Sequence, residues 1–261
     1  MSVQQQKFKE IADAIREKTG STELIKPSAF AAKVGEVYET GKEAERREFW
    51  EALTSNGAKE KYYYTFSENK WNGDNFNPTC DIVPTEADHM FYRHNYNGEA
   101  YDLAKRFEDN GCRLDFSNCT LGNYTFESAV VSRLPEINNA KGTFTCFVRN
   151  CKSLVTIDKI VCSDAGEQNF TQTFNYCRAL ENITFEGVIG RSISFPNSPL
   201  SVASMKNIIS TLKNYAGTDY EFTYALTLKS SCWAALDAEG ATAPGGINWR
   251  TYAENKGWIT D

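Results

Sequence analysis

The sequence has few histidines, no long apolar run and no excess of basic residues. Only His89 and His94 occur, in the polar stretch DHMFYRHNYNGE, where we expect both at the surface. Two histidines are too few to indicate both a catalytic triad and a metal site. No apolar run approaches the roughly 20 residues of a membrane-spanning helix, so membrane insertion is not expected. A net charge of -6 repels phosphate, so nucleic acid is not an expected partner.

Cysteine is present, but its pattern indicates neither a zinc site nor a disulfide framework. No C-x-x-C pair occurs, and a chain of 261 residues does not need disulfides to hold a core. We therefore expect free, buried thiols that pack as small apolar side chains, with no metal and no cofactor. The eight cysteines are Cys80, Cys112, Cys119, Cys146, Cys151, Cys162, Cys177 and Cys232.

Residues 1–56 carry a helical pattern of apolar positions. Gly20 and Pro27 interrupt it, and mixed charge is dense between Glu43 and Glu51. One interpretation is a solvated helix face, and the other is an apolar stripe that docks on a partner or on copies of the same chain. We favour docking or oligomerisation, because the stripe has no evident place in the rest of the chain. The candidate partner-binding residues are Phe8, Ile11, Ile15, Phe30, Val34, Val37, Phe49 and Trp50.

Aromatic side chains gather between positions 62 and 96. Tyrosine and tryptophan stack and form hydrogen bonds, which suits contact with a carbohydrate or a protein. The alternative is that half or more of these rings belong to the core, and the sequence leaves both interpretations open. The ligand-contact candidates are Tyr62, Tyr64, Trp71, Tyr92 and Tyr96.

An internal repeat is the main signal of the sequence. TFTCFVRNCKSLVTI begins at Thr143, and NFTQTFNYCRALENI begins 26 residues later at Asn169, so that Cys151 matches Cys177. Periods of about 20 to 50 residues indicate stacked units whose leucines and isoleucines face inward. A weaker upstream copy, at an offset of 20, matches Thr125 with Thr145, Leu134 with Leu154, and Ile137 with Ile157.

Residues 201–261 are expected to form an α/β cap beyond the repeats. Ser201 is expected to cap a helix that carries one apolar face and is closed by Gly217. One strand and two short helices are expected after it. A stack of repeats needs an atypical end to cover its core, and three large side chains can do so: Trp233, Trp249 and Trp258.

The repeats resemble a known family. NCKSLVTI and YCRALENI, each followed by an expected strand (DKIVC or TFEGVIG), are similar to the BspA-type leucine-rich repeats of bacterial surface and phage proteins. The stretches IADAIREKTG, RFEDNGCRLDFSNCT and SPLSVASMKNIISTLKNYAGT resemble tail-associated or other virion proteins of phages that infect Gram-positive gut bacteria. The resemblance covers nearly the whole chain and implies a component of a phage particle.

We therefore expect an α+β fold with N-terminal helices, a short leucine-rich-repeat-like β solenoid and a helical C-terminal cap. Residues 1–56 form the expected attachment or oligomerisation segment. Residues 57–200 form a β-rich body, with the repeats clearest over 143–189, and residues 201–261 form the α/β cap.

The resemblance implies a non-enzymatic structural or adhesive protein, such as a tail fibre or a receptor-binding element. The implied partners are other virion proteins, further copies of the chain (a trimer suits a fibre) and a host surface glycan or protein. The polar start Met1–Lys7 lacks the apolar stretch of a signal peptide. We expect synthesis in the host cytoplasm and a final place in the virion.

Two other functions stay open. The first is a bacterial surface adhesin of the same repeat class, although no signal peptide or wall anchor is evident. The second is a tail-associated polysaccharide hydrolase, which needs a pair of carboxylates in an acid/base arrangement. The candidate carboxylates are those of Asp102, Glu108, Asp109 and Asp115. They do not form a recognisable acid/base pattern.

Overall fold

The structure is a computed structural model, and it describes residues 13, 65–67, 76, 78–79, 81–94, 101–138, 144–162, 168–218 and 223–261. The contacts divide the chain into two units, Met1–Leu53 and Thr54–Asp261. The helices and strands with assigned bounds belong to the second unit. The expected N-terminal helices lie outside the described residues.

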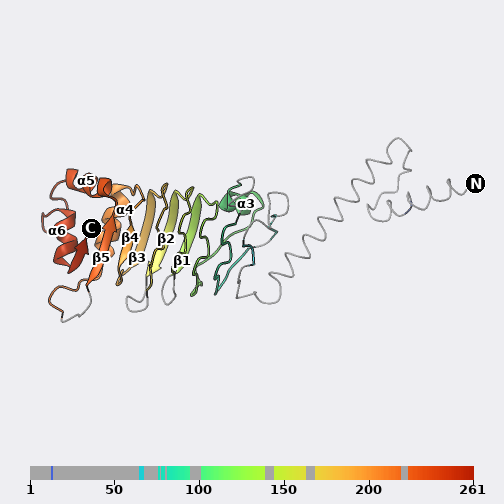
Figure 1. Cartoon of the computed structure of the whole chain (residues 1–261), viewed down its shortest axis with the longest axis horizontal. Helices are drawn as coiled ribbons and strands as arrows, with labels where there is room; N and C mark the ends of the chain where they lie inside the picture. Colours follow the sequence, from blue (N-terminus) through green and yellow to red (C-terminus); the bar gives the residue numbers. More distant parts are fainter. Residues whose placement is uncertain are drawn as a thin grey trace, which may run out of the picture. The chain divides into compact units, whose positions relative to one another are not determined.

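The described part of the second unit contains both helices and strands (Figure 1). Their order is α3 (Leu103–Asp109), β1 (Arg133–Asn138), β2 (Thr156–Cys162), β3 (Asn182–Gly187), β4 (Ile193–Phe195), α4 (Val202–Thr211), β5 (Tyr224–Leu228), α5 (Ser230–Ala238), α6 (Trp249–Asn255) and β6 (Trp258–Thr260). Strands β1, β2 and β3 lie side by side in Figure 1, and α5 and α6 lie near the C-terminus.

The strands form two separate parallel sheets of three strands each. One sheet has the order β1-β2-β3 and the other has the order β4-β5-β6. The prediction of a β solenoid is therefore wrong. Two small sheets and four helices give the described part of the chain a mixed α/β structure, in which no solenoid is present.

Helix α4 explains why the first sheet ends at β3. The Asn207 side chain accepts a hydrogen bond from the Phe185 backbone N–H at 2.6 Å and donates one to the Phe185 carbonyl at 3.1 Å. The Ser204 hydroxyl accepts another from the Ile183 N–H at 2.9 Å. Side chains of a helix thus occupy the backbone groups with which a further strand would pair. Strands β4, β5 and β6 consequently form a second sheet.

Four segments of eight residues share a backbone feature and are called the turn segments: 87–94, 122–129, 144–151 and 170–177. The third and seventh residues of each have a positive φ angle, between 52° and 62°, and none of them is glycine. A positive φ costs such a residue roughly 1–2 kcal/mol. Because the cost recurs at the same two positions, contacts between the turn segments must offset it.

The turn segments stack on one another through backbone hydrogen bonds. An amide at the third, fifth or seventh position donates to the carbonyl at the second, fourth or sixth position of the next turn segment. The same register holds across all three junctions. Examples are His89 to Asn123 (2.8 Å), Phe91 to Thr125 (2.7 Å), Tyr124 to Thr145 (2.9 Å), Phe126 to Phe147 (2.8 Å), Cys146 to Thr171 (2.9 Å) and Asn150 to Asn175 (2.8 Å).

Buried thiols at the eighth position satisfy carbonyls inside the stack. Cys151 Sγ donates to Phe126 O at 2.8 Å, and Cys177 Sγ donates to Val148 O at 3.0 Å, in each case the fifth residue of the preceding turn segment. Burial raises the pKa of Cys177 to about 12, so the thiol keeps its proton as a donor. Each carbonyl also accepts from a backbone N–H of its own segment, Phe126 O from Ala129 at 2.9 Å and Val148 O from Cys151 at 3.1 Å. The thiol therefore adds a second hydrogen bond, and this bond joins two neighbouring turn segments.

Phenylalanine occupies the fifth position in three of the four turn segments, and Val148 occupies it in the other. Stacked aromatic pairs contribute roughly 0.5–1.5 kcal/mol beyond their buried area. These rings stack on one another or on phenylalanines outside the turn segments, as in Phe66 with Phe91 (centroids 5.3 Å apart), Phe91 with Phe126 (5.2 Å) and Phe174 with Phe195 (4.5 Å). All five rings are buried.

The expected free and buried state is confirmed for the seven cysteines in the described part. The 26-residue repeat is also confirmed, because Cys151 and Cys177 make equivalent contacts and Ile157 pairs with Ile183. The upstream offset of 20 is wrong. Leu134 pairs with Ile157, 23 residues later, because the connection from turn segment to strand is one residue shorter in that copy. The copy at 87–94 was not predicted, since α3 and its flanks separate it from the next copy.

The C-terminal elements agree with the sequence in their order. The predicted helix end at Gly217 is wrong, because the backbone of Leu212 (ψ 133°) already leaves the helical conformation and α4 ends at Thr211, and strand β6 was not predicted. Ser201 Oγ accepts a hydrogen bond from the Ser204 N–H at 3.3 Å and begins α4, as predicted. Strand β5 and helices α5 and α6 follow in the expected order. The three tryptophans are buried, and each indole donates to an oxygen: Trp233 to Asp261 O (2.9 Å), Trp249 to Thr242 Oγ1 (2.9 Å) and Trp258 to Lys213 O (2.8 Å).

His94 takes the place of the thiol in the first turn segment. Its side chain is fully buried, its Nδ1 donates to Phe66 O at 2.6 Å, and its Nε2 lies 2.5 Å from the Tyr101 hydroxyl. Burial lowers the pKa of His94 to about 4, so the imidazole is neutral near pH 7. The expected surface position is wrong for His94, because residues distant in the sequence cover its ring.

We predict that acid weakens the fold through His94. Its pKa is about 4 in the folded chain and 6.5 when exposed, so the unfolded chain binds more protons between these values. The stability that His94 contributes is complete above pH 6.5 and falls by about 3 kcal/mol as the pH drops to 4. Urea titrations measure the free energy of unfolding at pH 7 and at pH 5. Its decrease between these pH values should be about 2 kcal/mol larger for the wild type than for His94→Gln, because glutamine does not titrate. Equal losses in the two proteins would contradict this prediction.

Candidate functional site

The stacking of the turn segments brings together six polar or aromatic side chains, called the outer row. They occupy the third and sixth positions of the turn segments. Because one register holds throughout the stack, equal positions meet even though the segments are far apart in the sequence. The outer row consists of His89, Tyr92, Tyr124, Glu127, Arg149 and Gln172.

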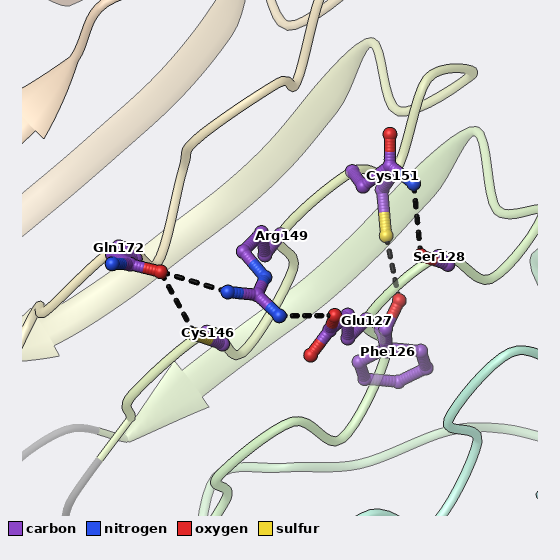
Figure 2. Close-up of polar contacts among 8 residues, drawn as sticks. Phe126, Glu127, Ser128, Cys146, Arg149, Cys151 and Gln172 are labelled. Atoms are coloured by element: carbon purple, nitrogen blue, oxygen red, sulfur yellow. Dashed lines mark hydrogen bonds and ion pairs between the residues drawn. The ribbon is translucent and has the colours of Figure 1, made fainter.

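An ion pair lies at the centre of the outer row (Figure 2). Arg149 Nη2 lies 2.5 Å from Glu127 Oε1, and Arg149 Nη1 donates to Gln172 Oε1 at 2.8 Å. The Glu127 side chain is only 8% exposed, and its Oε2 is buried without a hydrogen-bond partner in the described part of the chain. The hydrogen bond with Glu127 raises the pKa of Arg149. The buried carboxylate therefore depends on this guanidinium for its countercharge.

Aromatic rings form the other end of the outer row. The rings of His89 and Tyr124 stack with centroids 4.6 Å apart, and Tyr92 meets His89 edge-on at 5.4 Å. The Arg149 guanidinium lies 5.9 Å from the Tyr124 centroid. The neighbouring Cys146 raises the pKa of Tyr124, so its hydroxyl stays protonated. Half-buried planar groups that hold one another in place suit contact with a ligand, because little side-chain entropy is lost on binding.

A pocket of about 260 Å³ lies beside α3 and is called the α3 pocket. Its wall includes the buried side chains of Phe107 and Leu114. Two guanidinium groups, those of Arg113 and Arg133, also line it and are largely exposed, at 75% and 59% of their side chains. The pocket therefore combines an apolar wall with a charged rim.

Tyr92 is the predicted ligand-contact residue that the structure describes, and it belongs to the outer row. Its ring is half-buried, and the Arg93 guanidinium lies 5.0 Å from its centroid. The other ligand-contact candidates, Tyr62, Tyr64, Trp71 and Tyr96, lie outside the described residues. The partner-binding candidates also lie outside them and stay predictions: Phe8, Ile11, Ile15, Phe30, Val34, Val37, Phe49 and Trp50.

Local structure accounts for three of the four carboxylates that came into question for catalysis. Asp102 caps α3 by accepting from the Lys105 N–H at 3.0 Å, and Asp109 pairs with the Lys105 ammonium at 2.8 Å. Asp115 Oδ1 accepts from the Ser117 N–H at 2.9 Å. Glu108 instead lines the α3 pocket. The four carboxylates thus have different surroundings and do not form one group.

Sequence reasoning missed most of the outer row and all of the α3 pocket as sites. A signal for the row exists, because His89, Tyr124 and Gln172 each stand two residues before a phenylalanine of the interior. No comparable signal marks the pocket. Arg113, Arg133 and their neighbours come from separate segments and meet only in the fold.

No family model, no curated protein and no solved structure matches this chain. Its family resemblance therefore rests on the sequence motifs alone. Among the described residues, no group of three or more His, Cys, Asp or Glu side chains could hold a metal ion. In the same part of the chain, no helix is long and apolar enough to cross a membrane.

We predict that Glu127 makes Arg149 a stabilising residue. Arg149→Met leaves a buried carboxylate without countercharge, so the free energy of unfolding at pH 7 should fall by about 3 kcal/mol. Adding Glu127→Gln removes the charge and should recover about 1 kcal/mol or more. The measurement is urea unfolding of the two variants and the wild type.

Arg133→Met is the matched control for this comparison. The side chain of its partner Asp158 is 36% exposed, against 8% for Glu127. The free energy of unfolding of the control should therefore fall by less than about 1 kcal/mol. An Arg149→Met loss no larger than that of the control would show that Glu127 does not depend on the ion pair.

Proposed function

We propose that this protein is a non-enzymatic component of a phage particle, with a structural or adhesive role, and that the outer row is its contact surface. Residues 1–56 attach it to neighbouring virion proteins or to copies of itself. The second unit then displays the outer row toward a host surface. The protein acts by contact complementarity, and its place of action is the virion.

One observation carries the proposal: stacking in a single register holds the outer row in place from all four turn segments. Hydrogen bonds join Arg149 to Glu127 and Gln172, and the Tyr124 ring is fixed against His89. Aromatic and arginine side chains contribute most of the affinity in many interfaces. A surface that is already ordered loses little entropy when it binds. The sequence motifs quoted above supply the link to phage particles.

The hydrolase alternative has less support from the geometry. Glycoside hydrolysis needs two carboxylates that flank the scissile bond. The α3 pocket holds Glu108 and Asp158, but both oxygens of Asp158 accept hydrogen bonds from Arg133, at 2.9 and 3.0 Å. Asp158 is therefore occupied by a guanidinium. We propose binding without hydrolysis.

The test uses a phage whose genome encodes this chain. Antibody against the purified protein, labelled with gold, should decorate intact particles. Excess purified protein should also block adsorption of the phage to its host, because both compete for one receptor. Decoration without competition favours the structural role over the adhesive one. Particles that carry no label and adsorb normally in the presence of the protein would overturn the proposal.

Variants link adsorption to the outer row. Tyr92→Ser combined with Tyr124→Ser should raise the concentration needed for half-blocking at least tenfold, or about 1.4 kcal/mol. Lys105→Ala is the control, since this exposed side chain pairs with Asp109 on α3 and lies outside the row. Thermal unfolding verifies that each variant is folded. If the wild type, the double tyrosine variant and Lys105→Ala block adsorption equally, the outer row is excluded as the contact surface.

A further inference from the structure

The α3 pocket presents an apolar wall to a ligand. Phe107 and Leu114 are 2% and 7% exposed, so the core already fixes both side chains. Pro135 of β1 extends the wall with a rigid ring. A volume of about 260 Å³ lies just below the usual range of ligand sites, roughly 300–1,000 Å³. The pocket therefore suits one small ring with an apolar face.

The rim of the pocket holds two pre-formed guanidinium–carboxylate pairs. Arg133 binds Asp158 through Nε at 2.9 Å and Nη2 at 3.0 Å. Arg113 binds Asp81 through Nε at 3.1 Å and Nη2 at 2.8 Å. In each arginine, Nη1 makes no hydrogen bond within the described residues. Each pair thus holds a planar group in place and leaves donors for a ligand.

The charges of the rim disfavour ionic ligands. Asp81 and Asp158 compensate the two guanidinium groups, and Glu108 adds a carboxylate without an ion-pair partner among the described residues. An anion would meet these carboxylates, and a cation would meet the arginines. A neutral ligand with hydroxyl groups meets neither repulsion, because a hydroxyl accepts from Nη1 and donates to a carboxylate.

We propose that the α3 pocket binds one ring of a neutral carbohydrate. The apolar C–H face of the ring packs on Phe107, Leu114 and Pro135. Its hydroxyls accept from Arg113 and Arg133 and donate to Glu108. The inference goes beyond the proposed function, because it assigns a ligand class to a site separate from the outer row.

The experiment is saturation-transfer NMR and calorimetry on the full chain. The probes are methyl α-D-glucoside, methyl β-D-galactoside and methyl N-acetyl-β-D-glucosaminide, with inorganic phosphate and choline as the anion and the cation. At least one glycoside should bind more tightly than both ions. Arg133→Ala should weaken that binding at least about tenfold, through the loss of a charged donor. Arg133→Lys should weaken it too, because an ammonium lacks the planar fork.

Lys105→Ala on α3, outside the residues that line the pocket, is the control and should bind the glycoside as the wild type does. Arg133 is mostly exposed, so the thermal transition of its variants should stay close to that of the wild type. The inference is wrong if no glycoside binds, if either ion binds more tightly, or if both Arg133 variants bind the glycoside as the wild type does.

The outcome is separable from that of the adsorption test. Loss of glycoside binding in Arg133→Ala, with no effect of the wild type on adsorption, supports the pocket and contradicts the adhesive role. Blocked adsorption without glycoside binding contradicts the pocket and leaves the proposed function standing.

Discussion

Side-chain donors join neighbouring segments through buried backbone carbonyls. The Cys151 thiol donates to Phe126 O and the Cys177 thiol donates to Val148 O, each as a second hydrogen bond to a carbonyl that already accepts a backbone N–H. The His94 imidazole donates to Phe66 O. These donors reach their acceptors only when the segments stack in one register. The same register aligns the backbone hydrogen bonds that offset eight positive φ angles. Polar satisfaction and backbone strain therefore select a single arrangement.

The surface follows from that arrangement. Glu127 and Arg149 occupy the sixth position of successive turn segments, and Gln172 occupies the third position of the segment after them. The stacking brings these three side chains, distant in the sequence, into one hydrogen-bonded chain. The register also explains why a buried carboxylate is tolerated, since its countercharge comes from the next segment. At the β3 edge of the sheet β1-β2-β3, the Asn207 side chain of α4 bonds to the backbone of Phe185, and the sheet ends there. The interior of the stack thus holds the outer row in one arrangement.

The sequence predicts those parts of the fold that depend on local patterns of residues. The identical spacing around Cys151 and Cys177 predicts their equivalence, and Ser201 predicts the start of α4. It does not reveal the break between the two sheets, because that break depends on a helix side chain reaching a strand about 20 residues earlier. The burial of His94 also escapes prediction, since Phe66 and Tyr101 meet it only in the fold. Of the outer row, the sequence indicated only Tyr92 as a contact residue, and it gave no indication of the α3 pocket.

Native-state hydrogen exchange, read by NMR, is the most direct measurement of the stack. The amides of Phe91, Phe126 and Cys146 each donate across a different one of the three junctions. If one register holds the stack as a cooperative unit, these amides should exchange with the same opening free energy, equal to that of global unfolding. Exchange of one junction at a much lower free energy than the others would mean that the segments open independently, and the outer row would then not be a single ordered surface.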